Sequence, residues 1–487
     1  QCNIRLLVKV LRSGVSVFLE YRNSFIPTEH ARNIASTVDI ILSGVLTSSD
    51  VLLREATLLS DRNRSQIQKW NSTSLNHVQT TIHDTIADSI KKFPTQEAIC
   101  SWDGILTYQE LGHRAARLAS YLIGMGVGPE VVVPLCFDKS KWNIVAMLGV
   151  MIAGGAFLPL DPAAPKERIQ HLANATSAEM ILCSRTHAES LENIVGTIIA
   201  IDEEFLDSLP TEFKLPESRA ESHNLAYIIP TSGTTGQPKL TLLEHGNYCT
   251  GAKGHVSGLL MDTIEPIRAL QFAAHSFDAS IVELLTPLMI GGTVCIPDEH
   301  TRLNDIAKVI NDMRVTWASL TPTFVRFLHP SMVPTLTTIG LVGEAMSQAN
   351  LDTWTQINLI NGYGPSECAV AAVLNTKMTA HSDAKNIGFA ISSHAWVVNP
   401  NNYHELLPIG CVGELLIEGH IVGRGYLNDD LKTSQAFIHN VAWAGDRQFR
   451  GYLTGDLVVQ NPDGSLNIIG RKDSQVVSKA PYCDTTR

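Results

Sequence analysis

The sequence predicts an α/β fold with two sheet subdomains and a small β-barrel-like subdomain after them. From about residue 80, amphipathic helical segments alternate with short apolar strands, a pattern typical of layered proteins with largely parallel sheets. Near the C-terminus the pattern changes to short strands separated by turns. Such a change is typical of a small antiparallel β unit.

The first 76 residues differ from the rest. Residues 4–10 and 15–21 alternate in hydrophobicity as strands do, and residues 29–46 have the apolar spacing of an amphipathic helix. The polar segment 60–71 predicts a linker that docks on a neighbouring unit.

The α/β pattern begins with a helix predicted over residues 113–124, followed by a buried strand over 131–137. The next helix and strand are predicted over 143–153 and 157–160. Residues 142–160 lack charge over nearly the length that a bilayer requires. Two glycines and a proline interrupt this stretch, so we expect a buried helix, a turn and a strand, and no membrane association.

The antiparallel unit is predicted from strands over residues 413–419, 452–460 and 465–469. The sequence NPDG at 461–464 separates the last two strands and is a strong turn signal.

Composition limits the classes of function. The chain has 487 residues, of which 44% are hydrophobic and 17% are charged, and its formal net charge is −11. Since no basic run exceeds a pair such as Lys91–Lys92, nucleic acid is excluded as the main partner. The nine cysteines form no C-x-x-C pair, which favours free thiols in a reducing compartment, the cytoplasm, with no zinc site or disulfide framework.

The most informative segment is the loop after an apolar strand at residues 227–239, YIIPTSGTTGQPK. Its glycines expose backbone amides, its hydroxyls add neutral donors, and its lysine adds positive charge, a combination that suits a polyphosphate. It is not the G-x-x-x-x-G-K-[ST] P-loop. The alternative is a solvated Gly/Thr turn. The candidate phosphate-binding residues are Thr231, Ser232, Gly233, Thr234, Thr235, Gly236 and Lys239.

Two more segments carry candidate groups. In 361–367, NGYGPSE, a sharp turn projects Tyr363, whose ring can stack on a base, and Glu367, whose carboxylate can hold Mg²⁺ near phosphates. In 452–457, YLTGDL, Asp456 follows a strand, as carboxylates that bind ribose hydroxyls often do. Each motif alone is equally compatible with an ordinary turn.

Taken in order, these motifs resemble those of adenylate-forming enzymes, and among them the adenylation domains of nonribosomal peptide synthetases. The resemblance covers roughly residues 80 to 477. The matching segments are LTYQEL at 106–111, AGGAFLPLD at 153–161, the 231–239 loop, EHGN at 244–247, FDAS at 277–280, NGYGPSE at 361–367, GELLIEG at 413–419, RGYL at 424–427, YLTGDL at 452–457 and GRKDSQV at 470–476.

The resemblance implies that the chain uses ATP and Mg²⁺ to convert a carboxylate into an acyl-adenylate and pyrophosphate. Lys239, Glu367 and Thr231 are then the catalytic residues, with Glu367 holding Mg²⁺. Spread positive charge and backbone donors would stabilise the in-line transition state. The residues implied to hold the nucleotide outside the phosphate loop are Gly343, Asn361, Gly362, Tyr363, Ser366, Asp456 and Arg471.

Asp278 indicates an amino-acid substrate. In the amino-acid-activating branch, the aspartate at this position pairs with the substrate's α-ammonium, and a buried carboxylate needs such a partner. The alternative is a helix N-cap. The family's side-chain pocket corresponds to Ala279, Val282, Ser319, Gly340, Val342, Gly362, Val370 and Ala371.

These eight pocket residues are small and uncharged, which predicts a bulky, neutral substrate side chain. We expect Gly340 and Gly362 to leave the space for it. Large acylated hydroxyornithines, which fungal siderophore synthetases use, are one candidate substrate.

By the same resemblance, we expect three regions: a condensation-domain tail and linker (1–76), a large N-terminal adenylation core (77–470), and a hinge with the start of a C-terminal subdomain (471–487). The lid that completes such domains is expected to be absent, so adenylation by these residues alone should be slow. The implied partners are a carrier domain bearing phosphopantetheine and an upstream condensation domain, with the chain a monomer.

Two competing functions remain. An acyl- or aryl-acid ligase would have no use for Asp278, because its substrates carry no α-ammonium. A non-catalytic domain that only binds nucleotide is the other alternative.

Overall fold

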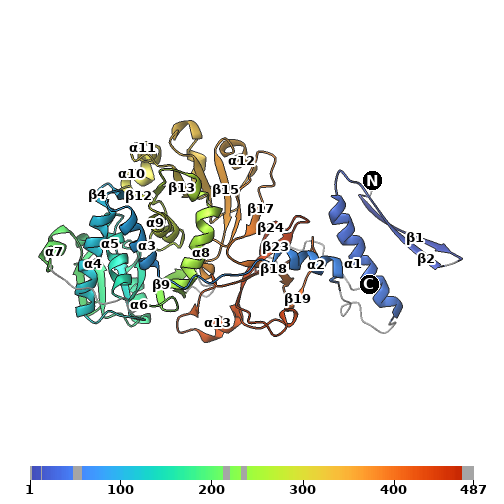
Figure 1. The fold of residues 1–487 in the computed structure, drawn as a ribbon, viewed down its shortest axis with the longest axis horizontal. Helices are drawn as coiled ribbons and strands as arrows, with labels where there is room; N and C mark the ends of the chain where they lie inside the picture. Colours follow the sequence, from blue (N-terminus) through green and yellow to red (C-terminus); the bar gives the residue numbers. More distant parts are fainter. Residues whose placement is uncertain (1–2, 13, 48–57, 212–219, 232–237, 474–487) are drawn as a thin grey trace.

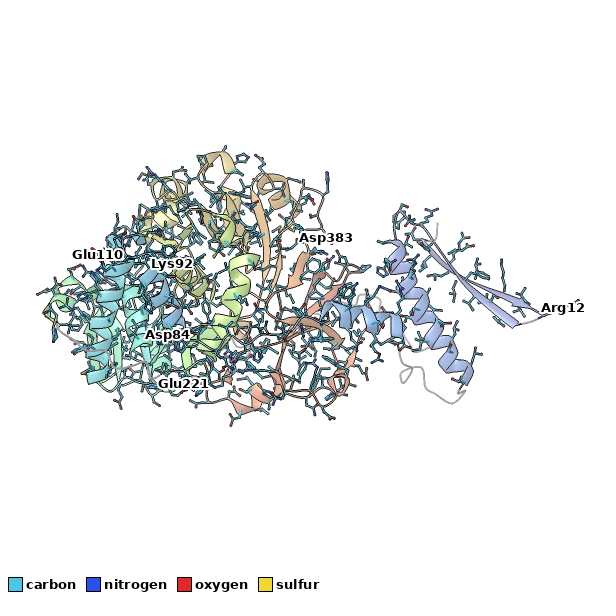
Figure 2. The ribbon with its side chains drawn as sticks, viewed as in Figure 1. Arg12, Asp84, Lys92, Glu110, Glu221 and Asp383 are labelled. Carbon is cyan, nitrogen blue, oxygen red and sulfur yellow. The ribbon has the colours of Figure 1, made fainter. Side chains whose placement is uncertain are left out.

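A computed structural model of the chain describes residues 3–12, 14–47, 58–211, 220–231 and 238–473 (Figure 1). The N-terminal part contains an antiparallel hairpin of β1 (Ile4–Leu11) and β2 (Gly14–Tyr21), followed by α1 (Thr28–Thr47). These elements confirm the predicted strands and helix. Arg12, at the tip of the hairpin, lies at the opposite end of the molecule from Glu110 (Figure 2).

The segment predicted as a linker is instead mostly helical. It forms α2 (Asp61–Trp70), which begins where the Ser60 side chain accepts a hydrogen bond from the Asn63 amide. The sequence pattern did not predict this helix because most of its residues are polar. Ile67 is its one fully buried apolar side chain. The predicted docking is present, since the Asn63 side chain accepts a 3.0 Å hydrogen bond from the Ile409 amide.

The first sheet has seven strands in the order β21-β10-β9-β6-β5-β7-β8. β5 to β9 pair in parallel, while β10 and β21 add antiparallel strands at one edge. The strands are β5 (Val132–Cys136), β6 (Ala156–Leu160), β7 (Met180–Cys183), β8 (Thr197–Ala200), β9 (Leu225–Thr231), β10 (Lys239–Glu244) and β21 (Gly425–Tyr426). The helices in this half of the chain are α3 (Ile82–Lys92), α4 (Tyr108–Gly124), α5 (Lys141–Ile152), α6 (Lys166–Ala175) and α7 (Glu203–Ser208).

The second sheet joins a largely parallel half to an antiparallel half. Its first half, in spatial order, consists of β4 (Gly104–Thr107), β3 (Glu97–Ser101), β12 (Thr293–Ile296), β11 (Arg268–Leu270), β13 (Trp317–Leu320), β14 (Thr338–Leu341), β15 (Asn358–Tyr363) and β16 (Val373–Asn375). Its second half consists of β17 (Asn386–Ala390), β24 (Leu466–Arg471), β23 (Gly451–Gln460), β20 (Val412–Glu418), β18 (His394–Asn399) and β19 (Asn402–Leu406), with β22 (Phe437–Ile438) beside β23. The antiparallel unit predicted near the C-terminus is therefore present, and its hydrogen bonding continues into the parallel strands through β16 and β17.

The two sheets share a hydrophobic core. It contains Tyr227 of β9, Val294 of β12, Tyr248 of α8 (His245–Gly258) and Leu285 of α9 (Ala279–Met289), all at most 1% exposed. The remaining helices are α10 (Glu299–Asn304), α11 (Ile306–Asp312), α12 (Gln348–Trp354) and α13 (Asp430–Ala436). The confirmed α/β class thus has a core that fixes the two sheets relative to each other.

The uncharged stretch at 142–160 folds as predicted into a buried helix, a turn and a buried strand. Nine consecutive residues of α5, from 143 to 151, are buried, and so are all five of β6. None of the helices in the described part of the chain is long and apolar enough to cross a membrane.

Candidate functional site

The ends of the predicted phosphate loop lie on neighbouring strands. β9 ends at Thr231 and β10 begins at Lys239, and these two residues pair across the antiparallel ladder. The Thr231 hydroxyl donates to the Lys239 carbonyl at 3.4 Å. The predicted contacts of Ser232, Gly233, Thr234, Thr235 and Gly236 lie outside the described residues.

Lys239 and Glu367 meet at the side chain of Tyr426. The Lys239 ammonium lies 4.8 Å from the centroid of the Tyr426 ring. Glu367, which is 6% exposed, accepts a 2.7 Å hydrogen bond from the Tyr426 hydroxyl through Oε1. The two charged residues predicted from separate motifs are therefore brought together by a third residue that the sequence analysis did not select.

A tight turn carries Glu367 and part of the substrate pocket. A Cβ on Gly364 would lie 2.1 Å from the carbonyl oxygen of Val370, so only glycine fits there. Ala369 and Val370 have φ of 52° and 79°, a conformation that is rare for a β-branched residue and is often found at functional sites. The same turn therefore carries both Glu367 and Val370, which lines the substrate pocket.

The residues predicted to hold the nucleoside form a connected group. The Tyr363 hydroxyl donates to Asp456 Oδ2 at 2.6 Å, and Arg471 lies 3.2 Å from Asp456 Oδ1. Burial raises the pKa of Tyr363 well above its usual value, so its hydroxyl remains a donor. A ribose that binds Asp456 must therefore share or replace the bond from Tyr363.

Of the other residues predicted to bind the nucleotide, two glycines line a cavity and an asparagine holds a neighbouring segment. Gly343 and Gly362 line the cavity described below. The Asn361 side chain donates to the carbonyls of Ala384 and Asn386, at 3.1 and 2.9 Å, so its amide group holds the segment that leads into β17.

Asp278 lies at the start of α9 without capping it. Its side chain makes no capping hydrogen bond and instead accepts one from the Ser366 hydroxyl at 2.6 Å. Burial raises the pKa of Asp278 to about 6, the Ser366 hydrogen bond opposes this rise, and the nearby charge of Glu367 adds to it. No cation in the described part of the chain forms an ion pair with Asp278, so the arrangement favours an external cation over the capping alternative.

One cavity of about 410 Å³ contains the whole predicted amino-acid pocket. Its lining includes all nine residues selected from the sequence: Asp278, Ala279, Val282, Ser319, Gly340, Val342, Gly362, Val370 and Ala371. The expectation that both glycines leave space is wrong for Gly362, where a Cβ would lie 2.8 Å from Val342 Cγ1. At Gly340 the nearest heavy atom to an added Cβ is 4.0 Å away, so this glycine does open the cavity.

The cavity also has bulky and charged walls that the sequence analysis missed. Phe272, Trp317, Glu283 and Arg302 line it. Glu283 follows Ala279 by four residues, and this helical spacing could have indicated that both face the cavity. The prediction of a lining composed only of small, uncharged residues therefore describes one part of the wall.

Glu283 and Lys139 anchor the segment that leads to Asp278. Glu283 Oε2 accepts hydrogen bonds from the amides of Phe272 and Ala273, both at 2.9 Å. The Lys139 ammonium donates to the Ala273 carbonyl and to the Gln271 side chain, both at 2.6 Å. Burial raises the pKa of Glu283. These contacts fix the backbone shortly before Asp278.

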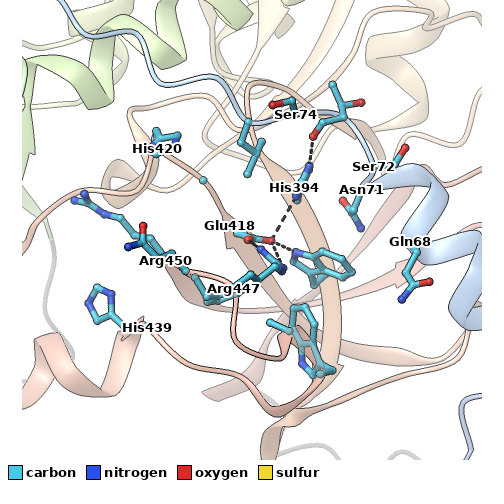
Figure 3. A pocket seen from close by; sticks show the side chains of 18 of the residues that line it. Gln68, Asn71, Ser72, Ser74, His394, Glu418, His420, His439, Arg447 and Arg450 are labelled. Atoms are coloured by element: carbon cyan, nitrogen blue, oxygen red, sulfur yellow. Dashed lines mark hydrogen bonds and ion pairs between the residues drawn. The ribbon is translucent and has the colours of Figure 1, made fainter.

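A larger cavity, of about 1140 Å³, lies between the α2 region and the antiparallel strands (Figure 3). Glu418 in its wall accepts hydrogen bonds from the Trp396 and Arg447 side chains, and its carboxylate lies 3.4 Å from the His394 ring nitrogen. None of the residues selected from the sequence lines this cavity. The smaller cavity, which contains the whole predicted amino-acid pocket together with Gly343 and Tyr363, is the candidate substrate site.

Comparisons with known proteins show the family of the chain. The AMP-binding enzyme family model matches residues 86–427. The chain is 47% identical over 98% of its length to nonribosomal peptide synthetase 1 of Aspergillus fumigatus, and 40% identical over 95% to N-benzoylphenylalaninol synthetase apmA of Penicillium brevicompactum. It spans only 8% and 20% of these relatives.

Solved structures show the same fold. A crystal structure of the nonribosomal peptide synthetase FmoA3 with bound α-methyl-L-serine-AMP has a TM-score of 0.84 at 22% identity, covering 97% of this chain and 54% of that one. The AMPPNP-bound form of the same protein has a TM-score of 0.83. The resemblance that the ordered motifs indicate is thus confirmed, and the chain belongs to the AMP-binding enzyme family.

Proposed function

We propose that the chain activates an amino acid with a bulky, neutral side chain as its aminoacyl-AMP, using ATP. The observation that carries this proposal is Asp278, a carboxylate without a cationic partner in the described part of the chain, in a cavity that Tyr363 also lines and close enough to Glu367 for the two charges to interact. An α-ammonium group would supply the missing charge, while the substrate's carboxylate would face the nucleotide residues.

In this reaction the substrate carboxylate attacks the α-phosphorus of ATP, forms the acyl–phosphate bond and releases pyrophosphate. Lys239 would offset the negative charge of the phosphates, and Asp456 would orient the ribose through its hydroxyls. These roles are electrostatic and positional, as is usual for transfer at phosphorus.

The Glu367 carboxylate is suited to bind Mg²⁺. A bound Mg²⁺ would neutralise part of the negative charge of the phosphates. Its Oε1 is held by Tyr426, whereas no hydrogen bond from the described residues reaches Oε2. A hard oxygen ligand of this kind matches the preference of Mg²⁺, which usually binds one or two carboxylates together with substrate phosphates. The described residues contain no cluster of three or more metal-ligating side chains, so ATP itself would provide further ligands.

The wider context is also part of the proposal. We propose that the activated amino acid is loaded onto a phosphopantetheine thiol of a carrier domain and that a condensation domain precedes the core, with siderophore synthesis one candidate pathway. The relatives' names and greater lengths support the presence of carrier and condensation domains beside such a core, and they do not bear on the siderophore pathway.

Substrate-dependent exchange between ATP and pyrophosphate separates the candidate functions. The assay requires a version that carries the expected C-terminal lid and a panel of amino, fatty and aryl acids. Exchange with amino acids supports the proposal, exchange only with acids that lack an α-ammonium supports an acyl- or aryl-acid ligase, and nucleotide binding without exchange supports a non-catalytic domain.

Replacing Glu367 by glutamine should weaken binding of ATP in the presence of Mg²⁺ by roughly 10- to 30-fold, because the variant loses a charged oxygen ligand. Glutamine keeps the size of the side chain and an oxygen that can accept from Tyr426, so the melting temperature without ligand should stay unchanged. Calorimetric titration of the 487-residue chain measures this effect, with EDTA-treated ATP as the control. Equal affinity of wild type and variant for ATP with Mg²⁺ would rule out the role of Glu367.

A further inference from the structure

Tyr426 joins the two halves of the proposed phosphate and Mg²⁺ site. It lies on β21, the two-residue edge strand of the first sheet, where it pairs with Thr241 of β10. Lys239 begins that same β10 strand. Glu367 lies on the turn after β15 of the second sheet. Tyr426, a residue of the first sheet, thus holds Glu367, which lies on the turn after a strand of the second sheet.

The Tyr426 side chain uses separate parts for its two charged neighbours. Its ring lies under the Lys239 ammonium at 4.8 Å, within the range of a cation–π interaction. Its hydroxyl donates to Glu367 Oε1 at 2.7 Å. The ring and the hydroxyl can therefore be removed separately by mutation.

A second tyrosine fixes the direction of this hydrogen bond. The Tyr452 hydroxyl lies 3.1 Å from that of Tyr426. Because Tyr426 has one hydroxyl proton and donates it to Glu367, Tyr452 must be the donor to Tyr426. The chain of donors runs from Tyr452 through Tyr426 to Glu367.

The Tyr426 ring is itself held in place. It packs edge-on against Phe437, with ring centroids 5.2 Å apart, and its backbone amide donates to the Thr433 hydroxyl at 2.9 Å. Tyr426 is 4% exposed. A buried ring with fixed neighbours has little freedom, so its hydroxyl can select one orientation of the Glu367 carboxylate.

We propose that Tyr426 is a positioning residue that binds one oxygen of Glu367 and so leaves the other free to bind Mg²⁺, while its ring holds the Lys239 ammonium at the start of β10. This inference rests on the proposed function, because it takes Glu367 as the Mg²⁺ ligand. Residues that orient a metal ligand through hydrogen bonds commonly change metal affinity by 10–100-fold when they are mutated.

The test compares three tyrosine variants with E367Q in the 487-residue chain, each titrated with Mg²⁺ at a fixed ATP concentration. Tyr426→Phe keeps the ring and should raise the Mg²⁺ concentration at half-saturation roughly three- to tenfold, less than E367Q because the carboxylate remains. Its affinity for ATP in EDTA should match that of wild type. Tyr452→Phe removes only the outer hydroxyl and should give a smaller shift than Tyr426→Phe.

Tyr426→Leu removes the ring as well and should also weaken binding of ATP in EDTA, since Lys239 loses its support. Melting curves of all variants show whether each is folded. If E367Q shifts the Mg²⁺ titration and Tyr426→Phe does not, the positioning role of Tyr426 is refuted while the role of Glu367 stands. If E367Q has no effect, the proposed function of the site fails first.

Discussion

Replacing Asp278 by asparagine should reduce amino-acid-dependent pyrophosphate exchange by roughly 30- to 1000-fold. Loss of one partner of a buried charge pair costs about 2–4 kcal/mol, and here the α-ammonium would be left without its counter-charge. Binding of ATP with Mg²⁺ should change far less than exchange, because Asp278 has no hydrogen bond to Lys239 or Glu367. Exchange assays in the lid-containing version and calorimetry with ATP measure the two effects.

Asp298→Asn is a matched control for this substitution. Asp298 also precedes a short helix, but its side chain does cap it, accepting from the Thr301 amide at 3.0 Å. We expect Asp298→Asn to leave exchange unchanged, because asparagine can keep this cap, whereas Asp278→Asn should lose exchange. If both variants keep exchange activity, Asp278 is an ordinary cap.

The pH dependence of amino-acid binding provides an independent check on Asp278. The pKa of this carboxyl is about 6 in the free protein, mainly because of burial. Below that pH the group is protonated and uncharged, so it cannot pair with an ammonium ion. Affinity for the amino acid should therefore fall as pH decreases through about 6 and reach a plateau above it.

Calorimetry between pH 5 and 8 measures this dependence in the wild type and in Asp278→Asn. The variant should bind weakly at every pH and lack the transition near 6. A wild-type affinity that is constant across this range would contradict the assigned pairing.

The sequence allowed the separate parts of the site to be predicted because each sits in a recognisable local motif. Lys239 and Glu367 were selected from two different loops, and their proximity depends on how β10 and the turn after β15 meet. That meeting is a tertiary contact between a strand of the first sheet and a turn that follows a strand of the second, and no local pattern encodes it. Tyr426, the residue that joins them, lies in the matching segment RGYL at 424–427 but was given no role in the site, because a two-residue edge strand has no periodicity that shows where its side chain points.

The limits of the pocket prediction have a similar cause. Matching residues to a family pattern identified nine cavity residues but omitted Trp317 and Phe272, which reach the cavity from β13 and the segment after β11. Volume and charge of a cavity depend on all its walls. The polar composition of α2 likewise hid a helix whose existence depends on a serine cap and on docking against Ile409.

Replacing Gly340 by leucine should exclude the bulky substrate while leaving the nucleotide site intact. An added Cβ at Gly340 would have no heavy atom closer than the Ala318 carbonyl at 4.0 Å, so a larger side chain would extend into the cavity. Overpacking of this kind costs about 1–3 kcal/mol, which corresponds to roughly 5- to 150-fold in affinity for the bulky substrate. Binding of ATP should be unaffected, and a smaller amino acid should be accepted equally well or better.

Gly362→Ala is the matched control, because its Cβ would lie 2.8 Å from Val342 Cγ1 and so would force Val342, the residue after β14, to shift rather than enter open space. We expect it to lower the melting temperature and to impair large and small amino acids alike. Exchange rates for both sizes of substrate, in wild type and both variants, separate the two effects. If Gly340→Leu also impairs bulky and small substrates equally, Gly340 does not limit side-chain size and the inference of a bulky substrate loses its main support.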